Sequence, residues 1–180
     1  MSERRIQMLE ATVRVIAQDG VRGLRVEKLA AEAGVSTALI YYHFKDRAGI
    51  LRAALEHVNH RAQTCTDTTS DDPRTQLEQM LLGELQDTGV VRETSVVWGE
   101  LRASAAFHEE LRPTLLATTN TWNADVAALV RQANPGLDAL AAAERLTALV
   151  EGLSERWHSG SLTLERAREL LAGAIGRELG

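Results

Sequence analysis

Side chains that suit contact with nucleic acid gather between residues 25 and 47 of this 180-residue sequence. Small and hydroxyl side chains permit close approach to phosphates and base edges, whereas imidazole, phenol and cationic groups reach them from farther away. The residues that offer such groups are Arg25, Ser36, Thr37, Ala38, Tyr41, Tyr42, His43, Lys45 and Arg47. Their chemistry predicts DNA binding, provided that the fold places them on one surface.

Three residues in the same stretch have the spacing of a helix-turn-helix. Ala30 is small enough for two helices to cross closely, Gly34 permits a tight bend, and Ile40 is a branched apolar anchor for the second helix. The pattern predicts a helix-turn-helix over about residues 25–44, whose second helix, about residues 36–43, enters the major groove. We call this second helix the recognition helix. A helical hairpin of another kind can match the same spacing by chance.

Several of these candidates also have ordinary structural interpretations. Ser36 suits the N-cap of the recognition helix. Tyr41 and Phe44 suit packing between helices, and for Phe44 burial is the favoured interpretation. Lys45 and Arg47 flank the start of the next helix, where cations and free backbone N–H groups together hold a phosphate, although either can be a solvated charge. Their position next to the recognition helix favours phosphate contact.

Hydrophobic periodicity predicts the helices that must position these groups. A stripe of apolar residues predicts a first helix over about residues 3–19, which Gly20 ends. Asp46 is the expected N-cap of a fourth helix that reaches about residue 62, and Asp72 with Pro73 opens a fifth helix that ends at Gly89. The polar residues 64–72 form the expected linker. The remaining helices are expected at about residues 92–106, 109–132, 138–158 and 163–179.

Composition and charge predict the fold class and a separation of functions between two parts of the chain. Apolar residues make up 44% of the chain, aromatic residues only 4%, and there are three prolines, which favours an all-α fold over a sheet. Residues 1–63 carry ten Lys or Arg against seven Asp or Glu, whereas residues 64–180 carry ten against eighteen. The basic part fits nucleic acid despite the overall charge of −5. We expect a DNA-binding domain at residues 1–63 and an effector-binding and dimerisation domain at residues 64–180.

The sequence also predicts where the protein works. No apolar run approaches the ~18 residues that a membrane span requires, and the first residues enter an amphipathic pattern directly. Cys65 is the only cysteine, so no internal disulfide is possible, and its neighbours offer no second soft metal ligand. We expect a cytoplasmic protein that contacts no membrane and carries no cofactor and no metal.

The last two predicted helices are unusually apolar for the end of a chain. A four-helix bundle with the same pair from a second subunit would bury them, which predicts a homodimer. Burial against their own chain is the alternative. Large side chains in residues 64–180 are candidates for the wall of an effector pocket, although such residues more often form plain core. The candidate ligand-binding residues are Met80, Trp98, Arg102, Trp122 and Trp157, and further polar residues that can orient a ligand are Glu100, His108, Asn123 and His158.

Two histidine patterns raise the alternative of a metalloenzyme. Glu155 and His158 match the Glu-x-x-His element of di-iron helical bundles, but the sequence contains no second copy. His57 and His60 lie three residues apart without an evident third ligand. The sequence therefore favours a binding protein over an enzyme. A third alternative is a helical dimer that has lost DNA affinity and serves only in protein interaction.

Residues 34–51, Gly-Val-Ser-Thr-Ala-Leu-Ile-Tyr-Tyr-His-Phe-Lys-Asp-Arg-Ala-Gly-Ile-Leu, resemble the signature of TetR-family transcriptional regulators. The detailed resemblance covers about residues 5–60. Beyond it, helix spacing and the Glu-Gly-Leu segment at residues 151–153 resemble BetI-like C-terminal domains. The resemblance implies three DNA-binding helices, a linking fourth helix and a ligand-binding dimer domain. It also implies a homodimer that binds a palindromic operator, usually as a repressor, and releases the DNA when a small-molecule effector binds.

The sequence departs from the family pattern at two places. Family members usually have Thr or Ser at the N-cap of the second helix, where this chain has Arg25. Arginine cannot accept the N–H bonds of a cap, but it can bind a phosphate. The Lys and Gly that are frequent early in the family's recognition helix are Thr37 and Ala38 here, so one phosphate contact of the family is missing.

Overall fold

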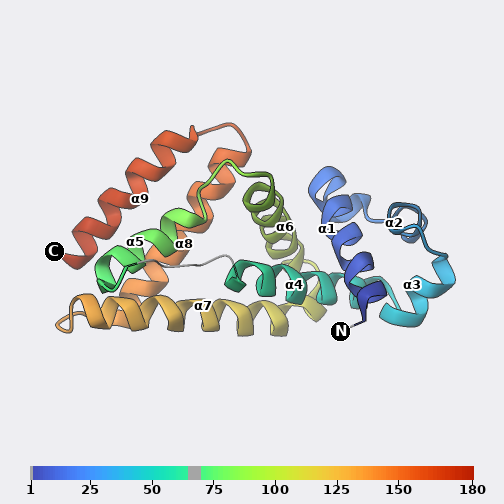
Figure 1. Ribbon diagram of the computed structural model, residues 1–180, viewed down its shortest axis with the longest axis horizontal. Coiled ribbons are helices and arrows are strands. Elements are labelled where there is room, and N and C mark those ends of the chain that lie inside the picture. The colour runs from blue at the N-terminus through green and yellow to red at the C-terminus, as the bar shows by residue number, and fades with distance from the viewer. Residues whose placement is uncertain (1, 65–69) are drawn as a thin grey trace. The chain divides into compact units, whose positions relative to one another are not determined.

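The computed structural model describes residues 2–64 and 70–180, and within them the side chains of all residues except 61–64. Nine α-helices and one 3-10 helix form in these ranges, without a strand, so the predicted all-α fold is confirmed (Figure 1). Cys65 and most of the predicted linker lie outside the described residues. The elements are α1 (Glu3–Gly23), α2 (Val26–Ala33), α3 (Thr37–Phe44), α4 (Arg47–Thr64), α5 (Pro73–Gly83), α6 (Gly89–Ala105), η1 (Glu109–Leu111), α7 (Arg112–Ala133), α8 (Ala139–His158) and α9 (Leu164–Leu179).

Two helix ends differ from the prediction. α1 bends at Gly20, whose φ of 69° and ψ of 173° lie outside the helical region, and then continues to Gly23. α5 ends at Gly83 instead of Gly89, which begins α6. The guanidinium of Arg168 donates to the carbonyl oxygens of Leu82 and Leu85 at 3.0 and 2.7 Å. Arg168 therefore binds carbonyl groups at and just beyond the end of α5.

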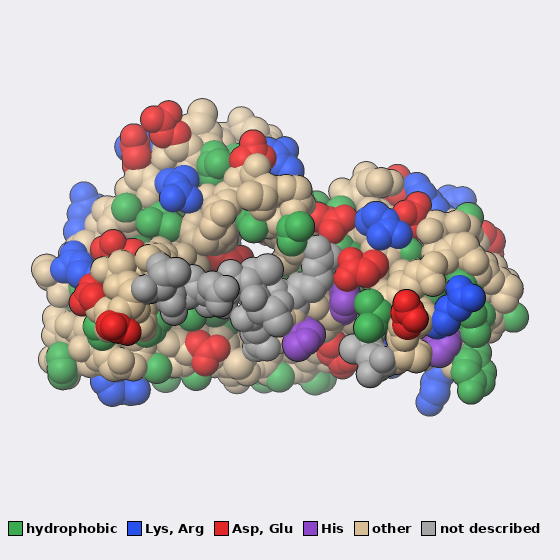
Figure 2. Space-filling model, viewed as in Figure 1, with side chains coloured by type: hydrophobic (Ala, Val, Ile, Leu, Met, Phe, Trp, Pro, Cys, Tyr) green, Lys and Arg blue, Asp and Glu red, His purple; other side chains and the backbone are tan. Residues whose placement is uncertain are grey.

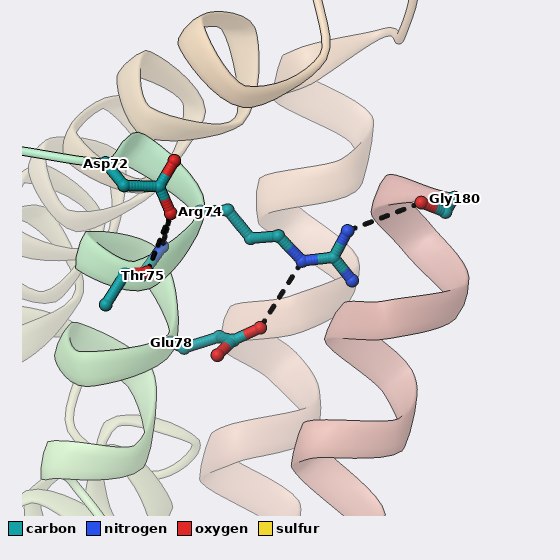
Figure 3. A network of polar contacts seen from close by, with 5 residues as sticks. All are labelled: Asp72, Arg74, Thr75, Glu78 and Gly180. Carbon is teal, nitrogen blue, oxygen red and sulfur yellow. Dashed lines mark hydrogen bonds and ion pairs between the residues drawn. The ribbon is translucent and has the colours of Figure 1, made fainter.

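The predicted N-caps are confirmed. The Ser36 hydroxyl accepts from the Leu39 N–H at 3.2 Å at the start of α3, and the Asp46 carboxylate accepts from the Gly49 N–H at 2.6 Å at the start of α4. The Asp72 carboxylate accepts from both the N–H and the hydroxyl of Thr75 at the start of α5 (Figure 3). Each such cap stabilises its helix by about 1 kcal/mol.

One compact unit, here called the N-terminal unit, consists of residues 1–63 together with residues 96–116. Within it α1 packs on α2, and α2 packs on α3. Residues from α6 and η1 complete its core, which the sequence did not predict. Its fully buried large side chains include Met8, Leu9, Ile16, Leu29, Ile40, Leu51, Leu55 and Leu101. The division at residues 63 and 64 concerns function and stays a prediction, whereas this unit is defined by packing.

The other unit, here called the C-terminal unit, consists of residues 64–95 and 117–180. α9 packs against both α8 and α5 in this unit. Two arginines fasten α5 to α9 at opposite ends, because Arg74 donates to the Gly180 carbonyl at 3.3 Å (Figure 3) while Arg168 binds the last turn of α5. The two helices are therefore antiparallel. Among the described residues no helix is both long and apolar enough to cross a bilayer.

A partly buried carboxyl group in the C-terminal unit makes stability depend on pH. Burial raises the pKa of Glu84 to about 6 from its ordinary value of 4.5. The folded state thus prefers the protonated form, and a penalty for ionisation grows as the pH rises from 4.5 through 6. At neutral pH this shift corresponds to at most about 2 kcal/mol, and solvent screening of the partly exposed group reduces it.

Replacement of Glu84 by glutamine is expected to stabilise the protein at neutral pH. The free energy of unfolding in urea should rise by up to about 2 kcal/mol at pH 7.5, and the gain should shrink as the pH falls toward 4.5. Glu56→Gln is the matched control, since Glu56 is an exposed glutamate. A gain that is the same at pH 7.5 and pH 4.5 would contradict the assignment to Glu84 ionisation.

Candidate nucleic-acid interface

The turn between α2 and α3 has the backbone that the sequence predicts. Gly34 adopts a left-handed conformation, with φ 63° and ψ 36°, directly after the last residue of α2. The Val35 N–H then reaches back to the Ala30 carbonyl at 2.9 Å, which closes the end of the helix. Ala30 and Ile40 are buried, at 4% and 0% exposure. The three residues of the helix-turn-helix pattern therefore hold α2 and α3 together.

One face of α3 is anchored in the core and the other is open. Ile40 and Phe44 are buried, which confirms the prediction of a core position for Phe44. Tyr41 and Tyr42 are exposed, at 49% and 80%. The other exposed residues at and before the start of α3 are Ser36, Thr37 and Ala38. Five of the nine candidates are thus exposed on, or directly before, one short helix.

The C-terminal end of α3 is fixed by α1. The guanidinium of Arg5 donates to the His43 carbonyl at 3.3 Å and lies 4.9 Å from the centre of the Phe44 ring. The His43 ring in turn meets the Tyr42 ring edge-on, with 5.2 Å between centroids. His43 is only partly exposed. Arg5 therefore helps to orient the part of α3 that carries the two candidate aromatic groups.

The corner between α3 and α4 is backbone-strained at Lys45. Lys45 has φ 67° and ψ −55°, and it is the one residue other than glycine with a positive φ in the described ranges. The Asp46 N–H donates to the Phe44 carbonyl at 2.8 Å across it. These values define a γ-turn of the strained form with positive φ. The turn leaves the Lys45 side chain exposed immediately beyond α3.

Gly49 permits this corner to be tight. A Cβ atom at Gly49 would overlap the carbonyl oxygen of Phe44, which is backbone and has no free side chain to move. The first turn of α4 can therefore approach the end of α3 only because residue 49 has no side chain. The place of Lys45 relative to α3 depends on this close approach.

The two candidate arginines have different environments. Arg25 precedes α2, is exposed, and makes no side-chain cap, as its residue type predicts. Arg47 is partly buried, and its guanidinium donates to the Val21 carbonyl at 2.5 Å and to the Leu24 carbonyl at 3.4 Å. Arg47 thus binds residues 21–24, here called the α1–α2 connection, which comprise the last turn of α1 after the bend at Gly20 and the residue that follows it. Its contact with a phosphate stays a prediction, as do all nine predicted DNA contacts.

Two other cations of the N-terminal unit are paired with carboxylates of the same unit. Arg14 lies 2.6 Å from Glu32, and Lys28 is paired with Asp19. Figure 2 accordingly shows basic and acidic side chains interspersed on the face in view. Among the residues whose side chains the structure describes, Arg25 and Lys45 have no such carboxylate partner. Among the nine candidate residues, these two cations are therefore the ones most available to phosphates.

Contacts between distant parts of the chain supply residues that sequence analysis missed. Arg5 and Gln7 bind the C-terminal carbonyls of α3 and α2, since Gln7 donates to the Ala33 carbonyl at 3.2 Å. Glu100, which the sequence suggested only for a ligand, accepts from the Val21 N–H at 2.8 Å. The pair Arg4 and Arg5 was a visible basic signal in the sequence. No local spacing could have indicated the partner of Glu100.

The candidate ligand-binding residues do not fall in one unit. Trp98 and Arg102 belong to the N-terminal unit, where the guanidinium lies 5.5 Å from the ring centre. Met80, Trp122 and Trp157 belong to the C-terminal unit and pack at its core. The structure thus assigns two of the five to the packing around the DNA-binding helices. Contact of any of the five with a ligand stays a prediction.

The histidine patterns have partners of another kind. His57 lies on α4 with its Nε2 atom 2.7 Å from a carboxylate oxygen of Glu10 on α1. His158 stacks on Trp157 at 4.3 Å between ring centroids, and desolvation lowers its pKa. Among the residues that the structure describes, no group of three His, Cys, Asp or Glu side chains is placed to hold a metal ion.

Both parts of the chain match known protein families. Residues 8–54 match the bacterial regulatory proteins of the tetR family, and residues 73–180 match the C-terminal domain of BetI-type transcriptional repressors. The second match alone covers more than half of the chain. This protein belongs to the TetR family. The helix-turn-helix of this TetR-family protein lies inside the first match.

Similar proteins agree with the family. The HTH-type transcriptional regulator BetI of Burkholderia mallei is 28% identical over 166 residues, which cover 90% of this chain and 84% of that protein. A crystal structure assigned to the TetR family, from Rhodococcus sp., is 46% identical with a TM-score of 0.92 and covers 100% of both chains. A transcriptional regulator from Saccharomonospora viridis, in complex with choline, is 27% identical with a TM-score of 0.88 over 98% of this chain and 97% of that one.

Membership of this family establishes the general activity. The protein is a DNA-binding transcriptional regulator of the BetI type, and this family consists of transcriptional regulators. The prediction of a TetR-family helix-turn-helix protein is confirmed.

Proposed function

We propose that this protein is a cytoplasmic homodimeric repressor that binds a palindromic operator and releases it when a small molecule occupies residues 64–180. The observation that carries the proposal is the arrangement of α3. Its outer face presents Thr37, Ala38, Tyr41 and Tyr42 while its inner face is locked in the core. A short helix held in this way enters the major groove with its polar side chains foremost.

The roles within the interface follow from exposure and existing bonds. We assign base edges to Thr37 and Ala38, which are small and lie at the start of α3, and phosphates to Arg25, Tyr42 and Lys45. The side chains of Ser36 and Arg47 already form hydrogen bonds with the backbone of the same chain. We assign to these two the placement of α3 and α4, with any phosphate contact by Arg47 made through its remaining N–H groups. Tyr41 and His43 flank the groove.

The surface of α8 and α9 supports the homodimer. Leu140 on α8 and Leu170 on α9 are 52% and 38% exposed. Gly152 and Gly173 lie inside the same helices, and a Cβ at either would meet nothing within 4 Å. A glycine inside a helix costs about 1 kcal/mol relative to alanine, which a close approach by a second helix would offset. We propose that these apolar and small residues pack against their copies in a second subunit.

We propose a quaternary ammonium compound such as choline as the effector to be tested first. The support is the similar regulator from Saccharomonospora viridis, whose crystal structure contains choline. Cations of this kind bind over aromatic rings and near carboxylates, and residues 64–180 carry an excess of eight negative charges. An arginine already lies over Trp157, since the Arg92 guanidinium is 5.1 Å from its ring centre. Trp122 is therefore our preferred aromatic contact.

Selection of bound fragments from random DNA tests the proposed function. The full chain should enrich a palindrome whose half-sites are about 34–36 Å apart, the spacing that two α3 helices of a dimer require. Addition of choline should then release the DNA and raise the thermal stability of the protein. Failure to enrich any sequence would refute the proposal, whereas enrichment without a response to choline would refute only the choice of effector.

A further inference from the structure

A single residue of the α1–α2 connection, Val21 in the last turn of α1, is bonded from two other helices of the N-terminal unit. The Val21 N–H donates to a carboxylate oxygen of Glu100 on α6 at 2.8 Å. The Val21 carbonyl accepts from the guanidinium of Arg47 on α4 at 2.5 Å. Val21 itself is 2% exposed. The connection between α1 and α2 is therefore fixed by one anionic and one cationic side chain.

Gly20 makes the contact with Glu100 both necessary and possible. Its φ of 69° and ψ of 173° take the backbone out of the helix, so the Val21 N–H is no longer aligned with the helical acceptor one turn earlier. A Cβ at Gly20 would lie only 2.8 Å from the Glu100 carboxylate oxygen. The bent backbone thus presents an N–H group, and the missing side chain leaves room for the carboxylate to accept from it.

The same connection is tied to the corner that carries Lys45. Arg47 is the first residue of α4 and follows the strained turn at Lys45 by two residues. Its second bond, to the Leu24 carbonyl at 3.4 Å, reaches the end of the connection. A displacement of residues 21–24 would therefore pull on Arg47 and, through it, on the α3–α4 corner.

α6 supplies the carboxylate from a helix that spans the division of the chain. Residues 89–95 of α6 belong to the C-terminal unit, and residues 96–105 belong to the N-terminal unit. An α-helix transmits a shift or rotation along its axis because its backbone bonds are continuous. Through Glu100, α6 is hydrogen-bonded to the turn that precedes the helix-turn-helix.

We propose that Glu100 is a positioning residue for operator binding, through which the state of α6 sets the placement of α3. The inference rests on the proposed DNA binding and adds to it a residue that touches neither DNA nor effector. The Glu100 carboxylate accepts a hydrogen bond from Val21, and the Val21 carbonyl accepts one from Arg47. Arg47 in turn begins the helix that follows the corner at Lys45. Release of the first bond loosens the corner and lowers the affinity for the operator.

Substitutions at Glu100 separate this role from simple electrostatics. Loss of a negative charge from the DNA-binding unit should by itself tighten binding to a polyanion. We expect the opposite for Glu100→Ala, an operator affinity lower by about tenfold, as is typical of coupling between distant sites. Glu100→Gln keeps an oxygen that can accept from Val21 and should stay within about threefold of the wild type. Glu56→Gln removes an exposed charge from the same unit and should leave binding unchanged or tighter.

Hydrogen exchange of the Val21 amide provides a direct second measurement. The amide should be protected in the full-length wild type and in Glu100→Gln, and it should exchange at least about tenfold faster in Glu100→Ala. This measurement on the wild type remains decisive if Glu100→Ala fails to fold, because an unprotected Val21 amide would overturn the inference.

The outcomes distinguish this inference from the proposed function. Equal operator affinity of the wild type and Glu100→Ala would overturn the role of Glu100 while leaving DNA binding intact. An equal loss in Glu100→Gln and Glu100→Ala would overturn the role of the hydrogen bond. Failure of the wild-type protein to bind any selected DNA would refute the proposed function, and this inference with it.

Discussion

Glutamates at positions 170 and 173 will convert the protein into a folded monomer that binds its operator at least about 100-fold more weakly. Leu170 is 38% exposed on α9, and Gly173 is also exposed with nothing within 4 Å of a Cβ placed there, so charged side chains at both positions can reach solvent in the single subunit. In the proposed dimer they would bury four like charges against a copy of the same surface. Buried charges without partners cost several kcal/mol each, which is enough to separate two subunits.

The loss of DNA binding follows from symmetry. Two linked recognition helices bind one palindrome with an affinity that exceeds the affinity of a single helix by about 10²–10⁴-fold. The measurement is operator binding together with the mass in solution and the helical content of Leu170→Glu/Gly173→Glu. Leu116→Glu is the matched control, because Leu116 is 62% exposed but lies on α7. A monomeric variant that binds the palindrome with wild-type affinity would exclude binding by the two recognition helices of a dimer.

Local sequence signals predicted the helix-turn-helix because its geometry depends on close neighbours. Gly34 adopts the left-handed backbone that its residue type permits, and Ser36 caps the helix that it begins. Ile40 and Phe44 are four residues apart and share one buried face of α3, which leaves Tyr41 and Tyr42 exposed. Residues within one helical turn decide each of these features, so the sequence contains them directly.

The local sequence patterns did not predict contacts between residues that are distant in the sequence. Glu100 and Val21 are 79 positions apart, and only the packing of α6 against the end of α1 brings them together. Arg47 was predicted to contact phosphate, which stays a prediction, and the sequence did not indicate that its guanidinium also donates to two carbonyls of the α1–α2 connection. Trp98 packs with the core of the DNA-binding helices, a contact that the sequence did not indicate, and its place in a pocket wall stays a prediction. Helical periodicity reveals which face of a helix is apolar, and not what covers it.

Lys45 allows the charge at the α3–α4 corner to be tested separately from the shape of that corner. Lys45→Ala and Lys45→Gly remove the same phosphate contact, so both should weaken operator binding to a similar extent. In each variant, the slope of log affinity against log salt concentration should become shallower by about one for each subunit, hence by about two for the dimer. Lys28→Ala is the matched control, because Lys28 is paired with Asp19 within the unit.

The two Lys45 variants should differ in stability because of the backbone at that position. A φ of 67° costs a residue with a Cβ atom about 1 kcal/mol relative to glycine. Lys45→Gly should therefore raise the free energy of unfolding by about 1 kcal/mol, while Lys45→Ala keeps the strain and leaves it nearly unchanged. A more stable protein with weaker and less salt-dependent DNA binding would mean that lysine is kept there for phosphate contact at a cost in stability. Wild-type salt dependence in both variants would place the phosphate contacts elsewhere on the N-terminal unit.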